Sequence, residues 1–218
     1  MTDEIRSLME KTAANLEKNN MKCIIAESAS DVPEIVKGLI KEGDTIASGG
    51  SVTLKETGVI DLLKSGAYNY LDRTGLNGAE ITECYRKAFS ADAYFSSSNA
   101  ITENGELYNV DGNANRVAAI TFGPSSVIIV AGYNKIVPDI NAAVMRVKTH
   151  AAPPNGVRLG LDTYCASKGE CCNMTGCEGD FAAGCKSSGR MCCTYVVTSH
   201  QRAKDRIKVI LVGEKLGY

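Results

Sequence analysis

Apolar residues recur at two different spacings along the first 65 residues, and the two spacings alternate. Ile5, Leu8, Met9 and Leu16 lie at helical spacing among polar residues and predict an amphipathic helix. Short continuous apolar runs, which are typical of buried strands, separate it from two further helical patterns. The predicted strands are residues 22–26 and 44–48, and the further predicted helices are residues 32–40 and 52–65. The alternation predicts an α/β fold with a largely parallel central sheet.

The pattern changes after a predicted helix at residues 77–90. Three short strand candidates, residues 94–101, 106–110 and 116–120, are separated by Asn104-Gly105 and by Asp111-Gly112-Asn113, both of which are strong turn signals. These strands predict a small antiparallel meander. A central-type strand at 127–131 and a helix at 138–150 follow, and strands at 195–198 and 207–212 are expected to complete the central sheet.

The length of 218 residues suits one domain, 1–218, with an elaborated insert at 165–193. The net charge is −1, Trp is absent and only four Phe occur, so the chain has no features of a nucleic-acid-binding protein. No apolar run approaches the roughly 20 residues needed for a membrane span. The charged start, residues 1–6, lacks the apolar core of a signal peptide, so we expect a cytoplasmic protein.

The chain has nine cysteines against two histidines, and seven of the nine lie between Cys165 and Cys193. That segment contains no Val, Ile or Leu and cannot form a core of its own. Neither C-x2-C zinc knuckles nor common ferredoxin spacings occur in it. Four thiolates suit an iron-sulfur cluster or tetrahedral zinc, and free or partly oxidised thiols are the alternative.

A glycine turn at Gly49 and Gly50 lies where a predicted strand ends and a predicted helix begins. Such a turn can cradle a phosphate or carboxylate, because the first N–H groups of a helix are unpaired. Ser51 and Thr53 add hydroxyl donors, and Glu56 adds one carboxylate near the same position. The alternative is a tight turn in which Ser51 only caps the helix.

Two further polar segments are candidate ligand sites. Asn99, Asp111, Asn115 and Arg116 lie in successive turns, where such residues commonly satisfy local backbone groups instead. Asn134-Lys135 follows the strand at 127–131, and a lysine at the carboxyl end of a strand is well placed for an anionic ligand.

Five segments, taken together and in order, resemble the lactate-utilisation (LUD) domain family. They are Gly49-Gly50-Ser51-Val52-Thr53-Leu54-Lys55-Glu56-Thr57-Gly58, then Ser98-Asn99-Ala100-Ile101-Thr102, residues 107–116, Phe122-Gly123-Pro124, and Val130-Ala131-Gly132-Tyr133-Asn134-Lys135-Ile136-Val137. The C-terminal residues 207–218 are similar as well. The resemblance implies a three-layer α/β sandwich related to the CoA-transferase and ribose-5-phosphate isomerase superfamily, whose ligands are phosphorylated sugars, acyl-CoA and folates.

The resemblance also implies roles for particular residues. Cys165, Cys171, Cys185 and Cys192 match the outer spacings of a four-cysteine pattern found in many family members, although Cys172 or Cys177 could replace one of the middle two. The turns at Asn99, Asp111, Asn115 and Arg116 are expected to line a shared pocket. We expect Gly49, Gly50, Ser51 and Thr53 to hold an anion, Asn134, Lys135 and Arg116 to assist, and Glu56 to orient or transfer a proton.

Two functions follow from this resemblance, and a third remains open. The first is an accessory protein in the oxidation of lactate or a related 2-hydroxy acid, with an iron-sulfur cluster and oxidoreductase partner proteins. The second is an enzyme or sensor for a small anion such as acyl-CoA or a sugar phosphate, whose cysteine loop is held by zinc or disulfides. The third is a scaffold subunit without a ligand of its own.

Overall fold

The computed structural model describes residues 1–218 and has a central sheet of six strands. Every pair of neighbouring strands in this sheet is parallel, which confirms the predicted fold class. The order is β1-β10-β7-β4-β2-β3. The strands are β1 (Lys22–Ala26), β2 (Thr45–Ser48), β3 (Asn69–Tyr70), β4 (Ala93–Ser96), β7 (Ser126–Gly132) and β10 (Ile207–Val212).

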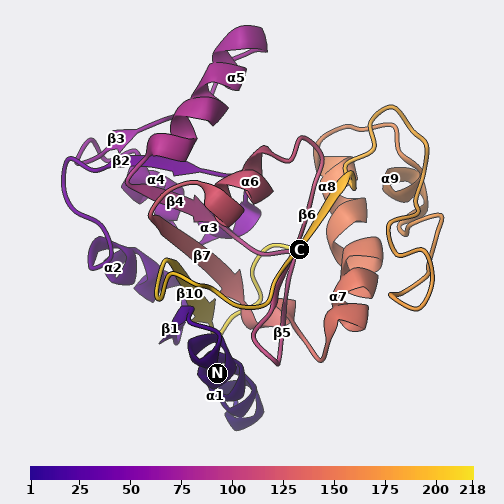
Figure 1. Ribbon diagram of the computed structural model, residues 1–218, viewed down its shortest axis with the longest axis horizontal. Coiled ribbons are helices and arrows are strands. Elements are labelled where there is room, and N and C mark those ends of the chain that lie inside the picture. Colours follow the sequence, from indigo (N-terminus) through magenta and orange to yellow (C-terminus); the bar gives the residue numbers. More distant parts are fainter.

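Helices cover both faces of the central sheet and form a three-layer sandwich (Figure 1). Alternate residues of β7 point to opposite faces, so Val127 and Ile129 belong to one core while Ile128 and Val130 belong to the other. The first face packs against α1 (Asp3–Lys18) and α6 (Asn115–Phe122), and the second against α2 (Val32–Lys37), α3 (Val52–Glu56) and α4 (Val59–Leu63).

A second sheet of four strands lies beside this sandwich, in the order β8-β5-β6-β9. Its strands are β5 (Ala100–Thr102), β6 (Leu107–Asp111), β8 (Ile136–Val137) and β9 (Thr194–Thr198). β6 pairs antiparallel with both β5 and β9, whereas β5 and β8 are parallel. Of the predicted antiparallel meander only the β5–β6 pair is present; the strand on the other side of β6 is β9 and not residues 116–120, and the sheet is mixed.

The second sheet has its own small core, shared with the helices that follow it. These are α7 (Ile140–Arg146), a π-helical turn (Val147–Ala151), α8 (Ala152–Arg158) and α9 (Tyr164–Lys168). Residues 169–193 then run to β9 without a helix or strand. At the top of the view, α5 (Gly78–Lys87) projects from the body and buries none of its residues (Figure 1).

Four sequence expectations need correction. Residues 116–120 are helical, because the Asp111 carboxylate accepts the backbone N–H groups of Arg116 and Val117 at 3.0 and 3.2 Å and so starts α6. The helix expected at 52–65 is divided in two at Gly58. This glycine has a left-handed φ of 70° and is the N-cap residue of the second helix, α4. Residues 94–101 divide between the two sheets as β4 and β5, and residues 195–198 join the second sheet, so only 207–212 completes the central one.

No helix in the structure combines the length and the apolar character required to cross a lipid bilayer.

Candidate functional site

Three neighbouring parallel strands, β7, β4 and β2, end at the same edge of the central sheet. The glycine turn follows β2, Ser97 follows β4, and Lys135 lies three residues beyond β7. The glycine turn, Ser97 and Lys135 border a cleft of about 610 Å³. Ligands of open α/β sheets bind at such carboxyl ends. Eight of the ten residues expected to bind ligand line this cleft: Gly50, Ser51, Thr53, Asn99, Asp111, Asn115, Arg116 and Lys135.

Lys135 is the most unusual residue of the cleft, since its side chain is charged by default yet only 3% exposed. Its Nζ lies 2.9 Å from Thr53 Oγ1 and 2.8 Å from Ser97 Oγ, and no carboxylate forms an ion pair with it. Burial, together with the charges of Arg146 and Arg116, lowers the pKa of Lys135 to about 7, while Glu56 opposes this shift. The cleft therefore holds a buried lysine that has no ion-pair partner and is only partly protonated at neutral pH.

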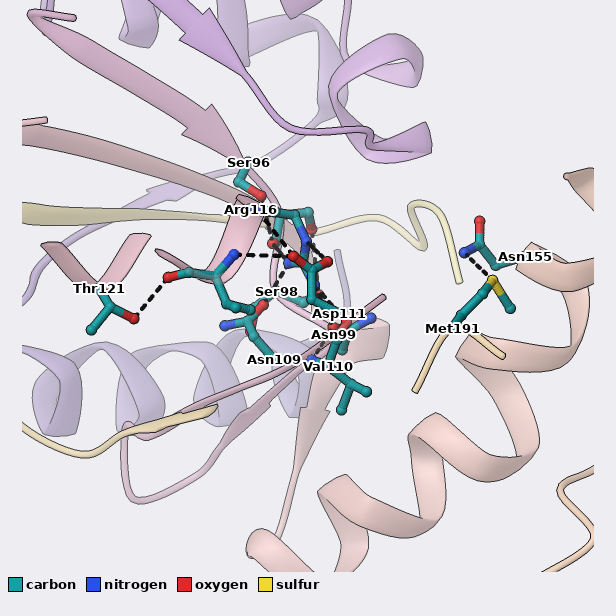
Figure 2. A network of polar contacts seen from close by, with 12 residues as sticks. Ser96, Ser98, Asn99, Asn109, Val110, Asp111, Arg116, Thr121, Asn155 and Met191 are labelled. Carbon is teal, nitrogen blue, oxygen red and sulfur yellow. Dashed lines mark hydrogen bonds and ion pairs between the residues drawn. The ribbon is translucent and has the colours of Figure 1, made fainter. Parts of the chain in front are cut away.

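Arg116 fixes one wall of the cleft (Figure 2). Its guanidinium donates to the side chains of Asp111, Asn109 and Asn99 and to two backbone carbonyls, those of Ser97 and Val110. These five bonds match the five N–H donors that an arginine carries. Arg116 therefore contributes positive charge to the cleft, while its hydrogen bonds hold the turns at 97–99 and 109–111 in place.

The two glycines of the turn serve different neighbours. A Cβ at Gly49 would lie 3.0 Å from Arg116 Cγ and Cδ, so the absence of a side chain lets Arg116 pack against the turn. A Cβ at Gly50 would lie 2.9 Å from Arg73 Nη2, which places this guanidinium directly over the turn. Ser51 Oγ accepts the N–H of Leu54 at 3.2 Å, so Ser51 does cap α3 while also lining the cleft.

Asn134 and Glu56 lie outside the cleft lining and hold the C-terminal segment 213–218. Asn134 Oδ1 accepts the N–H of Leu216 at 3.1 Å, and Glu56 Oε2 accepts the N–H of Gly217 at 2.7 Å. A Cβ on Gly217 would lie 3.4 Å from Lys135 Nζ. The segment thus covers the lysine from one side, and Glu56 contacts this backbone directly.

Sequence reasoning missed several side chains of the site. Arg146, on α7, donates to the backbone carbonyls of Asn134 and Asn99. Tyr218 also lines the cleft, and its hydroxyl is buried without a hydrogen-bond partner. Three more arginines line the cleft: Arg73, Arg158 and Arg190. Only Arg73 carried a usable signal, because it closely follows edge strand β3 at the same end of the sheet.

The four cysteines matched to the family pattern, Cys165, Cys171, Cys185 and Cys192, converge on one small cavity of about 30 Å³. Cys172 also lines it, whereas Cys177 does not. The side chains do not form a ready-made group of three or more metal ligands. Burial and the neighbouring Cys165 and Cys171 thiols raise the pKa of Cys192 to about 12. Cys192 lines the larger cleft as well, so the two cavities share a wall.

The chain is similar to two solved structures and matches one family model. A crystal structure of a DUF162 family protein from Deinococcus radiodurans is 17% identical, covers 96% of this chain and 97% of its own, and has a TM-score of 0.49. The structure of eIF2B beta from Chaetomium thermophilum is 15% identical, covers 51% of this chain and 40% of its own, and has a TM-score of 0.34. No curated protein matches the chain. The LUD domain model matches residues 9–212, and the chain therefore belongs to the LUD domain family, which relates it to proteins of lactate utilisation.

Proposed function

We propose that the chain binds an organic anion in the cleft and acts as an accessory protein in the oxidation of lactate or a related 2-hydroxy acid. The observation that carries the proposal is the buried ammonium of Lys135, which lacks a carboxylate partner and lies near Arg116 and Arg146. A buried charge is costly without a counter-ion, so a carboxylate or phosphate at this position is strongly favoured. Family membership supports the choice of a 2-hydroxy acid.

Calorimetric titration of the protein with L-lactate and with pyruvate tests this proposal. Binding is expected to weaken as the pH rises above about 7, because Lys135 then loses its charge. Lys135→Met is expected to abolish binding, whereas Lys37→Met, which removes an exposed lysine of α2, leaves it unchanged. Gly50→Asp, which places a carboxylate next to Arg73, is expected to compete with the anion. If no anion binds to the folded protein, the proposal is wrong.

The size of the cleft favours a second candidate, a larger anion such as acyl-CoA or a sugar phosphate. Its volume of about 610 Å³ lies in the range of sites for much larger molecules than lactate. Arg73, Arg158 and Arg190 also lie on the cleft wall, where they suit additional phosphate groups. Titration with acetyl-CoA and with ribose 5-phosphate, under the same conditions, distinguishes this candidate from the first.

The cysteine cavity is proposed to hold a metal through Cys165, Cys171, Cys185 and Cys192. An all-thiol donor set fits both an iron-sulfur cluster and zinc. A cavity of about 30 Å³ is closer to the size of a single zinc ion than to that of a cluster. The thiols must still move together to bind zinc, because no three of them form a ready-made ligand group, and a cluster requires the loop to open further. An iron-sulfur cluster would supply electron transfer, and an oxidoreductase partner would then be needed; zinc would hold the loop in place.

Anaerobic purification followed by an absorption spectrum and by iron and zinc analysis tests this second part. Bound iron with a visible absorption band supports an accessory protein that transfers electrons through an iron-sulfur cluster. One bound zinc ion per chain supports a cysteine loop that zinc stabilises. Colourless protein that contains neither metal and cannot be reconstituted with either contradicts a metal site. Such a result leaves the anion-binding proposal intact, because that rests on the other cavity.

A further inference from the structure

Two hydroxyl groups flank the amine of Lys135, and that of Ser97 has no role in the anion binding described above. Ser97 Oγ lies 2.8 Å from Nζ and Thr53 Oγ1 lies 2.9 Å from it. Both residues line the cleft, so the group of three faces the space that a ligand would occupy. A lysine amine at hydrogen-bond distance from a serine hydroxyl, with no carboxylate between them, is the arrangement of a nucleophile and its general base.

The electrostatic surroundings suit the amine form of the lysine. The charged groups that act on Nζ are Arg146 from α7, Arg116 from α6 and Glu56 from α3, of which only Glu56 favours the ammonium. With the burial of Nζ, they bring the pKa of Lys135 to about 7. A general base is most effective when its pKa lies close to the working pH.

We propose that Ser97 and Lys135 form a nucleophile–base pair that transfers an acyl group from an ester or thioester bound in the cleft. This proposal rests on the function proposed above in one respect: the cationic walls of the cleft would bind the anionic portion of such a substrate. It adds a covalent reaction to what was so far a binding site.

Ser97 is the nucleophile of the two hydroxyls because it is the more accessible. Thr53 is fully buried, and its Oγ1 also donates to the Leu216 carbonyl at 3.4 Å. The backbone of Gly217 covers it, since a Cβ there would lie 2.6 Å from Thr53 Oγ1. Ser97 retains 7% exposure, and the only other acceptor of its hydroxyl is the Ser98 carbonyl at 3.5 Å. Thr53 therefore orients Nζ while Ser97 faces the substrate.

The reaction balances without a cofactor or a change of oxidation state. The neutral amine of Lys135 takes the Oγ proton as Oγ bonds to the carbonyl carbon, and the π electrons move to the carbonyl oxygen. When the carbonyl re-forms, the bond to the alcohol or thiol breaks, and the leaving group takes the proton from the Lys135 ammonium. Water then attacks the acyl-Ser97 ester in the same way. The net change is ester or thioester plus water to acid plus alcohol or thiol.

A neutral fluorophosphonate probe, whose fluoride a serine Oγ displaces, tests the pair without requiring anion binding. Intact mass analysis of the full chain is expected to show one adduct, which peptide mapping assigns to Ser97. The labelling rate is expected to rise with pH through about 7. Lys135→Met should slow labelling about 100-fold or more, the usual contribution of a general base.

Two serine variants provide the control. Ser97→Ala is expected to remove the adduct, whereas Ser98→Ala should retain it, because Ser98 Oγ donates to the Ala100 and Tyr108 carbonyls and not to Lys135. Absence of any adduct on the folded wild-type protein, or equal labelling of Ser97→Ala, overturns the proposal. Failure to bind lactate, acetyl-CoA or ribose 5-phosphate with labelling intact would instead refute the anion-binding function alone.

Discussion

At the scale of single residues, the burial of Lys135 in the cleft lowers the stability of the folded protein. The folded protein holds its side chain almost fully buried, where the charged form is disfavoured. In the unfolded chain the same lysine is solvated and has an ordinary pKa near 10.4. Between these two values the unfolded chain binds more protons than the folded protein, so the stability contributed by this group rises with pH from about 7 upward.

We therefore predict that Lys135→Met stabilises the protein, and most strongly at low pH. The gain over wild type should be about 2 to 3 kcal/mol larger at pH 6 than at pH 9, because the penalty for burying the charge is complete below the folded pKa and fades above it. Urea denaturation of both proteins at the two pH values measures this. A gain that is equal at both pH values would show that Lys135 does not titrate in this range.

Arg116 differs from Lys135 because all its donors are already used within the protein. We predict that Arg116→Lys destabilises the fold by about 2 to 4 kcal/mol, since an ammonium with three N–H donors cannot satisfy five acceptors, three of which belong to buried residues. Arg158→Lys is the matched control, because Arg158 is exposed and donates only to Asn155 Oδ1. Urea denaturation of the two variants should separate them clearly, and equal losses would contradict the anchoring role of Arg116.

At the scale of elements, the sequence predicted four of the six central strands, β1, β2, β7 and β10, but it missed β3 and merged β4 with β5. Buried strands such as β7 are continuous apolar runs that have no other explanation, so their bounds could be predicted to within about a residue. The segment 116–120 has an equally apolar character, but its helical state depends on the Asp111 carboxylate, which reaches it from the end of β6. The spacing of apolar residues within a segment does not reveal a contact with a side chain outside that segment.

In the site, too, residues fixed by local patterns could be predicted, whereas residues brought in by tertiary contacts could not. Glycine and lysine turns at strand ends could be predicted, because parallel strands bring their carboxyl ends to one edge. Arg146 and Tyr218 could not, since they come from a helix of the smaller core and from the segment after β10, whose positions follow only from the tertiary structure. Asn134 and Glu56 lie outside the cleft lining, and their contacts with Leu216 and Gly217 depend on that same segment.

The turn between β5 and β6 offers a test of how elements of the two layers join. Gly105 has a φ of 83°, and a Cβ there would lie 2.7 Å from backbone atoms of Asn15 and Leu16 in α1. Gly43 has the same φ with open space around it. We predict that Gly43→Ala costs about 1 to 2 kcal/mol through backbone strain alone. Gly105→Ala should cost at least about 1 to 3 kcal/mol more, because α1 must move. Thermal unfolding of the two variants measures the difference. Equal losses of stability would mean that α1 moves away from the new side chain without a cost in free energy.

At the scale of the whole molecule, the cleft lies between the central sheet and the smaller core with its cysteine loop. One wall consists of the turns after β2, β4 and β7, and the opposite wall includes α8 and residues 188–192 of the loop. Asn155 of α8 contacts Met191 of the loop, with 3.3 Å between Nδ2 and Sδ (Figure 2). Arg190 holds the loop together by donating to the carbonyls of Ala182, Cys185 and Cys192. The state of the cysteines therefore bears on the shape of the cleft.

From this shared wall we predict that loss of the proposed metal weakens anion binding in the cleft. Cys185 lines only the small cavity, so Cys185→Ser removes a proposed ligand without altering a side chain that faces the anion. The variant should bind the anion about fivefold more weakly or worse than wild type, and amide hydrogen exchange of residues 186–193 should become faster. Cys23→Ser on β1, which lines neither cavity, is the control and should change neither. Faster exchange with unchanged anion affinity would show that the loop moves independently of the cleft, because a coupled wall cannot loosen without changing the free energy of binding.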